Sequence, residues 1–196
     1  MKKVLAFVLA ALMVLSLASC SKAGFNRGKV DGNVYENESV GITFTAPENW
    51  EFMSEEEISV EWNLGNKSFD EQLKGGEAFD AVAKCTAPGA GNLAMFKLVD
   101  LNVKYGEALT IEEYVEELRG EFEQKNPKSQ VRVSDLESVE FGGEAFTRVV
   151  IGTLEDKTSV RYVTFLKELE EEGRLFSATV MLLDETEFDD VEAMFK

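Results

Sequence analysis

One amphipathic helix followed only by strand-like segments is the pattern that most constrains the fold of this chain. Thr110 and Glu113 form a capping box, and Asn126-Pro127 ends the helix. Between them, apolar side chains recur at helical spacing: Ile111, Tyr114, Val115, Leu118 and Phe122. The apolar period then becomes two, over residues 131–133, 139–141, 145–154, 161–169 and 175–183. Strands clustered after one long helix favour an α+β fold, in which helices pack on an antiparallel β-sheet.

The remaining segments predict further pieces of the same architecture. Residues 34–37 and 41–47 predict an opening hairpin, and residues 79–85 and 93–103 predict two more strands. Ser54 and Glu57 form a second capping box, which predicts a short helix to about Leu64. Thr186 predicts the start of a final helix with inward-facing Phe188, Val191, Met194 and Phe195. Because no internal repeat is present, we expect a single domain over residues 34–196.

The first twenty residues have the order of a secretory signal. Lys2 and Lys3 precede an apolar run over residues 4–17, which is shorter than the roughly 20 residues that a membrane-spanning helix needs. The residues Leu17-Ala18-Ser19-Cys20 resemble the lipobox of bacterial lipoprotein precursors. This resemblance implies a signal peptide over residues 1–19, and a lipid with acyl chains such as palmitate on Cys20. The glycine-rich stretch over residues 20–33 predicts a flexible tether.

These observations predict where the protein resides and which partners it lacks. We expect a bacterial exported lipoprotein, lipid-anchored through Cys20 to the outer, extracytoplasmic face of the cell membrane. The net charge of −17 argues against a nucleic-acid partner, because binding to phosphates requires a surplus of Lys and Arg. The chain contains no histidine, which excludes Ser-His-Asp and Cys-His catalytic pairs and imidazole metal ligands.

Two single residues in the strand over residues 79–85 invite a chemical interpretation. Cys85 follows Phe79, Ala81 and Ala83 at period two, which predicts a small buried hydrophobic residue rather than a reactive thiol. Asp80 lies between Phe79 and Ala81, where alternation predicts a solvent-facing or hydrogen-bonded structural acid. One of two paired carboxylates in a hydrolase is the alternative for Asp80.

Two further motifs, one rich in glycine and one acidic, have ordinary structural explanations. The sequence over residues 89–94 matches the dinucleotide spelling G-x-G-x-x-A, but a strand-like run follows where that motif needs a helix, so we expect a turn and no cofactor. Acidic side chains gather in residues 112–117 and 170–172, yet no calcium-loop pattern exists, so we expect solvated faces and no metal site. Trp50 and Trp62 have the spacing of core residues.

Several of these segments resemble the PsbP-like proteins. The residues that carry the resemblance are Tyr35, Asn37, the run Gly41-Ile42-Thr43-Phe44 with Pro47 and Trp50, the capped helix over residues 110–123, and the Arg161-Tyr162-Val163 hairpin with a closing helix. The resemblance covers residues 34–196, although residues 66–76 have no clear counterpart. It implies an antiparallel sheet with helices and no catalytic site common to the members.

We therefore expect a membrane-anchored exported lipoprotein that is not an enzyme. Its domain would be a binding or envelope-assembly module with a protein partner in the cell envelope. Two alternatives stay open from the residues alone: a carboxylate-dependent cell-envelope hydrolase, and a weak calcium- or solute-binding protein.

Overall fold

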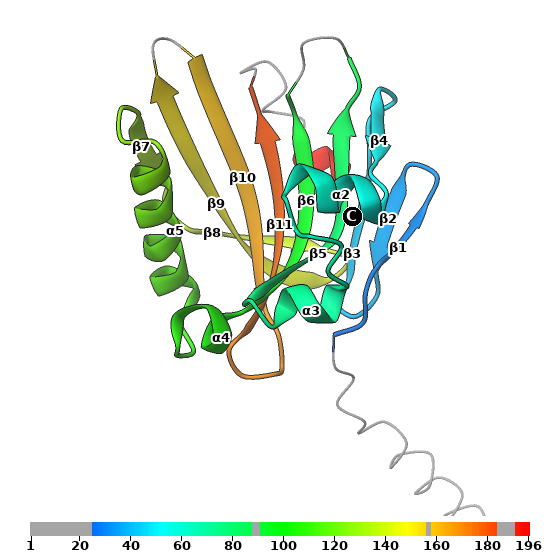
Figure 1. The fold of residues 1–196 in the computed structure, drawn as a ribbon, viewed down its shortest axis with the longest axis horizontal. Coiled ribbons are helices and arrows are strands. Elements are labelled where there is room, and N and C mark those ends of the chain that lie inside the picture. Colours follow the sequence, from blue (N-terminus) through cyan, green and yellow to red (C-terminus); the bar gives the residue numbers. More distant parts are fainter. Residues whose placement is uncertain (1–24, 88–90, 156–157, 184–190) are drawn as a thin grey trace, which may run out of the picture.

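An eight-stranded antiparallel sheet forms the centre of the computed structural model, which describes residues 25–87, 91–155, 158–183 and 191–196. The strands follow the order β4-β5-β6-β11-β10-β9-β7, and β8 pairs with another part of β9 (Figure 1). Their bounds are β4 Trp50–Phe52, β5 Glu77–Cys85, β6 Leu93–Asp100, β7 Gln130–Val133, β8 Glu137–Phe141, β9 Glu144–Glu155, β10 Thr158–Glu168 and β11 Arg174–Leu182. The predicted antiparallel α+β class is confirmed.

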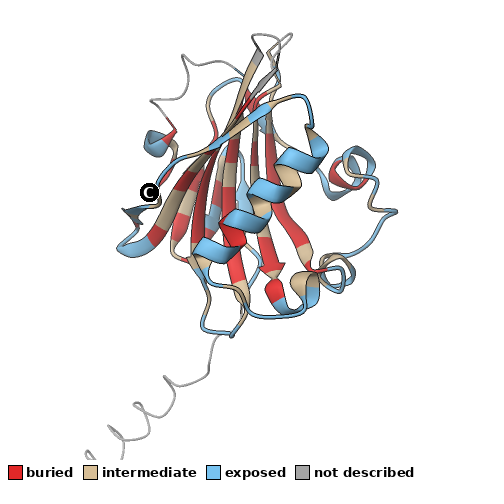
Figure 2. Cartoon of the chain, turned by 90° about the vertical axis from the view of Figure 1, so that its left-hand side faces the viewer, coloured by how far each residue is buried: buried red, intermediate tan, exposed pale blue. Residues whose placement is uncertain are grey.

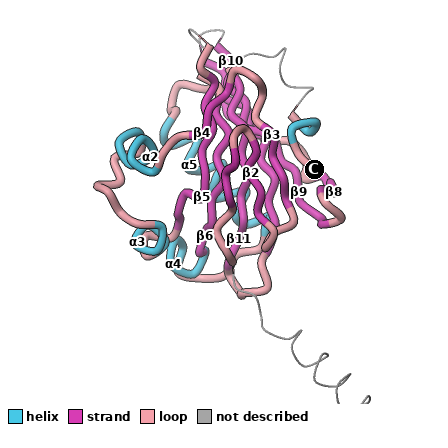
Figure 3. Tube along the Cα trace, turned by 90° about the vertical axis from the view of Figure 1, so that its right-hand side faces the viewer, coloured by secondary structure: helices cyan, strands magenta, loops and turns pink. Residues whose placement is uncertain are grey.

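A small sheet covers one face of the large one. It consists of β1 Lys29–Asp31, β2 Val34–Asn37 and β3 Ile42–Thr45, and Figure 3 shows β2 and β3 in front of the large sheet. The predicted opening hairpin is β2 and β3, which pair antiparallel. The main core fills the space between the sheets and is strongly aromatic: Tyr35 and Phe44 come from the small sheet, and Phe96, Phe165 and Phe176 come from the large one.

Helix α5, Ile111–Lys125, lies on the other face of the large sheet, the one that the small sheet does not cover (Figure 2). Neighbouring residues of a strand point to opposite faces, so they contact different layers. Phe165 belongs to the core between the sheets, whereas the next residue, Leu166, packs with Tyr114 and Val115 of α5. Figure 2 shows α5 lying across this face. A separate cluster beneath α2, Glu55–Glu61, joins Ile58 and Trp62 to β5 and β6.

Local sequence signals account for the helix ends. The capping boxes at Ser54 and Thr110 are present as predicted, and each hydroxyl accepts a hydrogen bond from the backbone N–H of the glutamate three residues later. A third capping box at Ser68 starts α3, Phe69–Leu73, inside the segment that has no counterpart in the PsbP-like pattern. The strand predicted over residues 93–103 ends early, because Asp100 caps α4, Leu101–Tyr105.

The C-terminal segment differs in part from the expected helix. The residues from Thr186 to Phe188 lie outside the described residues, and the described part is a short 3-10 turn, η2, Glu192–Met194. Phe195 is buried against Phe44, and Lys196 exchanges two backbone hydrogen bonds of 2.9 Å with Thr43. The last described residues therefore complete the small-sheet layer.

The start of the described chain corrects the expected domain boundary. The predicted tether over residues 20–33 is wrong from Phe25 onward, since β1 pairs with β2 and Phe25 stacks on Phe69 at 6.0 Å between ring centroids. The folded domain thus begins before residue 34. The signal segment and Cys20 lie outside the described residues. Within the part of the chain that the structure describes, no helix is long and apolar enough to cross a membrane.

Candidate functional site

Asp80 is buried inside the domain and does not face solvent. Its side chain has no exposed surface. Oδ2 accepts hydrogen bonds from the Tyr35 hydroxyl at 2.6 Å, the Asn37 amide at 3.1 Å and the Gly28 backbone N–H at 2.8 Å. Oδ1 accepts one from Arg27 Nε at 3.2 Å. The surface alternative for Asp80 is wrong, and the hydrogen-bonded structural alternative is confirmed.

A β-bulge explains why alternation fails at this position. The register of β5 against β6 shifts between Phe79 and Ala81. Phe79 therefore belongs to the cluster beneath α2, at 4.7 Å from Trp62, whereas Ala81 and Ala83 face the small sheet. Cys85 shares the face of Ala83 but not that of Phe79. Its free thiol is half-buried, at 3.6 Å from the Asn49 amide nitrogen.

The surroundings of Asp80 suit a structural latch better than acid–base catalysis. Both carboxylate oxygens are occupied by protein donors, and no face of the side chain is open to a substrate. Burial, followed by the charge of Asp80, raises the pKa of Tyr35 well above its ordinary value, so the Tyr35 hydroxyl stays protonated as a donor. These hydrogen bonds attach both residues 27–28 and strand β2 to Asp80 of strand β5.

A second charged network ties the helices to the large sheet. Lys97 and Lys104 contact the two oxygens of Glu77 at 3.2 and 3.1 Å, and Lys104 also contacts Glu121 of α5 at 3.1 Å. Burial raises the pKa of Glu77, but the two lysines outweigh it and lower this pKa to about 2. Burial lowers the pKa of Lys104, and the acids and tyrosines around it, led by Glu77, raise it overall.

Replacing Glu77 with glutamine is expected to lower the free energy of unfolding at neutral pH, and acidification should remove the difference. The folded pKa of about 2 lies below the ordinary 4.5, so the Glu77 carboxylate stabilises the fold above pH 4.5 and this contribution falls as the pH drops toward 2. Urea unfolding of both proteins across this range is the measurement. An equal gap at both ends of the range would contradict the charge-based explanation.

The acidic surfaces hold no cluster suited to a metal ion among the described residues. On α5, Glu113 serves the capping box, and Glu116 forms an ion pair with Arg119 at 3.7 Å. In the turn between β10 and β11, Glu171 forms an ion pair with Arg174. The residues of the G-x-G-x-x-A match lie partly outside the described chain, and Leu93 begins a strand instead of a helix.

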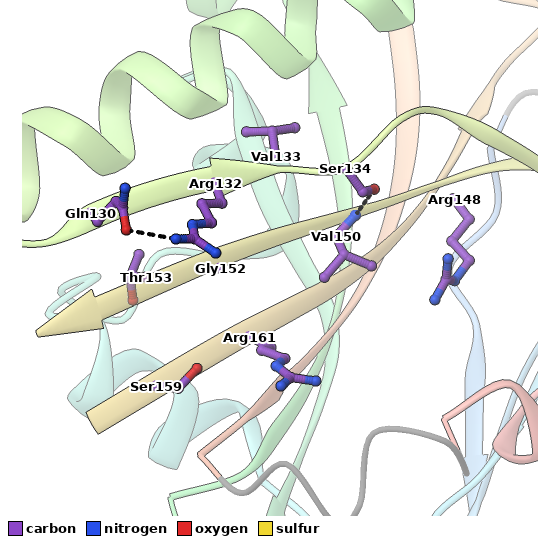
Figure 4. Close-up of a pocket in the computed structure, with 10 residues that line it drawn as sticks. All are labelled: Gln130, Arg132, Val133, Ser134, Arg148, Val150, Gly152, Thr153, Ser159 and Arg161. Atoms are coloured by element: carbon purple, nitrogen blue, oxygen red, sulfur yellow. Dashed lines mark hydrogen bonds between the residues drawn. The ribbon is translucent and has the colours of Figure 1, made fainter. Parts of the chain in front are cut away.

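An arginine-lined groove on the large sheet is the site that sequence reasoning missed. It has a volume of about 580 Å³ and lies on strands β7, β9 and β10 (Figure 4). Its walls contain three of the chain's six arginines, Arg132, Arg148 and Arg161. The other lining residues are Gln130, Val133, Ser134, Val150, Gly152, Thr153 and Ser159.

The strand register arranges this groove. Gly152 of β9 is the direct partner of Arg132 on β7 and of Arg161 on β10, so the three residues form one row across the sheet. Figure 4 shows the two arginines on either side of Gly152. A Cβ atom built on Gly152 would meet no heavy atom within 4 Å, so the middle of the row is open space. The floor beside it includes Val150.

The charge of Arg148 is already compensated inside the protein. Arg148 contacts Glu137 at 2.6 Å and Glu192 at 3.0 Å, which joins β9 to β8 and to η2. Arg132 is exposed, and its guanidinium donates to the neutral Gln130 side chain at 3.0 Å. Arg148 thus has acidic partners and Arg132 a neutral one, so the groove is more electropositive at Arg132 than at Arg148.

A second hollow, of about 500 Å³, lies beside β1 and β2 and includes Asn26, Asn37 and Ser39 in its lining. Its polar groups bind one another: Ser39 donates to the Asn37 side-chain oxygen at 2.6 Å, and Asn37 donates to the Asn26 carbonyl at 3.1 Å. These hydrogen bonds within the protein account for the polar side chains that line the hollow.

Comparisons with known proteins give the fold. No protein-family model and no curated protein matches the chain. The solution structure of cyanobacterial PsbP (CyanoP) from Synechocystis sp. PCC 6803 is similar, with a TM-score of 0.51 and 12% identity over 91% of this chain and 96% of that chain. The crystal structure of LpqN, involved in cell envelope biogenesis of Mycobacterium tuberculosis, aligns with a TM-score of 0.41 and 12% identity over 78% of this chain and 76% of that one. The domain thus has the PsbP-like fold that the sequence resemblance implies.

Proposed function

We propose that the protein is an exported lipoprotein, held on the outer face of the cell membrane by lipid on Cys20, whose PsbP-like domain is a non-catalytic binding module of the envelope. The observation that carries this proposal is the order of the first twenty residues: two lysines, a short apolar run, and Leu-Ala-Ser before the cysteine. The buried and fully bonded state of Asp80 supports the non-catalytic part.

The start of the folded domain gives such an anchor a geometric consequence. Phe25 lies five residues after Cys20 and contacts Phe69 and Phe176. Five residues span roughly 18 Å at full extension, so the domain would lie close to the bilayer. In Figure 1 the chain enters the domain at the lower edge, whereas β7 and the ends of β9 and β10 that are joined through residues 156–157 lie at the upper edge. The arginine-lined groove would then point away from the membrane.

Replacing Cys20 with serine tests the anchor. We expect the variant to accumulate as an unprocessed precursor or to leave the membrane fraction, because the acyl chains supply about 0.8 kcal/mol of membrane affinity per buried methylene group. Metabolic labelling with palmitate, followed by membrane fractionation, measures both steps.

Cys85→Ser is the matched control, because it removes the other cysteine of the chain and leaves the lipobox intact. It should keep both the label and the membrane location. The proposed anchor is wrong if Cys20→Ser retains the palmitate label and fractionates with membranes like the natural protein.

A further inference from the structure

We propose that the arginine-lined groove binds a small amphiphilic oxyanion, with its carboxylate or phosphate over Gly152 between Arg132 and Arg161. Nothing in the proposed membrane anchoring requires this site.

The row across β7, β9 and β10 supplies the anion-binding geometry. Neighbouring strands lie about 4.8 Å apart, so the two arginine backbones flank Gly152 at a separation of roughly 10 Å. Because Gly152 has no side chain, the space between the two arginines is open to a ligand. Arginine presents a planar fork of N–H donors that matches the oxygens of a carboxylate or phosphate.

The charges around the row favour an anion over a cation. Arg148 is held by Glu137 and Glu192, so it supports the wall of the groove and is not needed for the ligand. Arg132 has a neutral hydrogen-bond partner in Gln130. In a chain with a net charge of −17, the exposed Arg132 brings a positive charge to the groove that its neutral partner Gln130 does not offset.

The size and floor of the groove indicate an amphiphile. Val150 lies beside the arginines on the same face of the sheet as Gly152, whereas the Val133 side chain packs with the α5 cluster on the other face. The volume of about 580 Å³ lies within the roughly 300–1,000 Å³ of typical small-molecule sites. A bare inorganic ion would leave most of this space unfilled, whereas an alkyl group attached to the anion would cover the Val150 side chain.

Calorimetric titration of the full chain in a non-ionic detergent tests the ligand class. The probes are hexyl phosphate and hexanoate, which separate a phosphate from a carboxylate source, and inorganic phosphate, hexan-1-ol and hexyltrimethylammonium serve as comparisons. We expect at least one of the two anionic amphiphiles to bind about 10-fold more tightly than each comparison compound, since hydrogen bonds to a charged group are stronger than those between neutral groups. Equal affinity for hexan-1-ol or hexyltrimethylammonium, or binding of neither anion, would overturn the proposal.

Two variants locate the binding within the groove. Arg132→Gln keeps a polar side chain but removes the charge, and it should weaken binding about 10-fold. Gly152→Phe places a ring in the open space and should abolish binding without lowering the melting temperature, because its Cβ meets no atom within 4 Å and aromatic residues suit strands.

Arg119→Gln is the matched control on the exposed face of α5, where it should leave binding unchanged. If Gly152→Phe does not fold, Arg132→Gln alone decides. Unchanged affinity in Arg132→Gln, or an equal loss in Arg119→Gln, would overturn the assignment of the site.

Discussion

Replacing Asp80 with alanine is expected to destabilise the domain by about 3–5 kcal/mol, because it leaves buried donors without their acceptor. The Tyr35 hydroxyl and the Asn37 amide lose a partner in the core between the sheets, and Arg27 loses its buried counter-charge. The free energy of unfolding from urea titration measures the loss. Hydrogen exchange should also show faster exchange at Lys29–Asp31, because the latch that holds the chain before β1 is gone.

Glu55→Ala is the matched control for Asp80→Ala, since it removes the other acid that binds Arg27. The Glu55 side chain is 81% exposed, whereas that of Asp80 is fully buried. Exposed ion pairs contribute little, so the control should cost less than about 1 kcal/mol. Equal losses in the two variants would show that Asp80 acts only as a surface partner of Arg27 and not as the centre of a buried cluster.

Local signals in the sequence are sufficient to predict most of the elements. The capping box at Thr110 and the apolar stripe of α5 depend on residues three and four positions apart, and the structure contains both. The hairpin of β10 and β11 likewise follows from period-two segments on either side of an acidic turn. These features depend on residues that are close to one another in the sequence, so they can be predicted from a single sequence.

The latch at Asp80 depends instead on contacts between distant parts of the chain. A bulge after Phe79 changes which face each following residue occupies, and no residue in β5 marks it. The partners Arg27 and Gly28 lie in a glycine-rich stretch that has the composition of a linker. They are ordered by an acid more than fifty residues away, which local periodicity does not predict.

The arginine-lined groove shows the same limit of local reasoning. Arg132, Gly152 and Arg161 become neighbours only through the register of three strands. The sequence does hold one usable signal, a glycine inside a long strand, because such a glycine often marks a bulge or a close approach of a ligand or another backbone. Combined with arginines on both adjacent strands, this signal predicts an anion site once the strand pairing is known.

Phe96→Ala is expected to lower the free energy of unfolding by about 3–5 kcal/mol, because Phe96 of the large sheet packs against aromatic side chains of the small sheet. It is fully buried, and its ring centroid lies 4.1 Å from that of Tyr35 and 5.1 Å from that of Phe44. Removing the ring leaves a cavity between the two sheets and takes away two favourable aromatic contacts. Urea unfolding monitored by circular dichroism measures the change.

Phe122→Ala is the same substitution on the helix side of the large sheet, where the ring is only half-buried and lies 4.6 Å from Tyr162. It removes the same number of atoms, but solvent already reaches the site, so the expected loss is about 1–2 kcal/mol. The difference between the variants therefore reports on burial and not on the chemistry of the side chain. A larger loss for Phe122→Ala than for Phe96→Ala would place the main core under α5 and contradict the two-sheet arrangement.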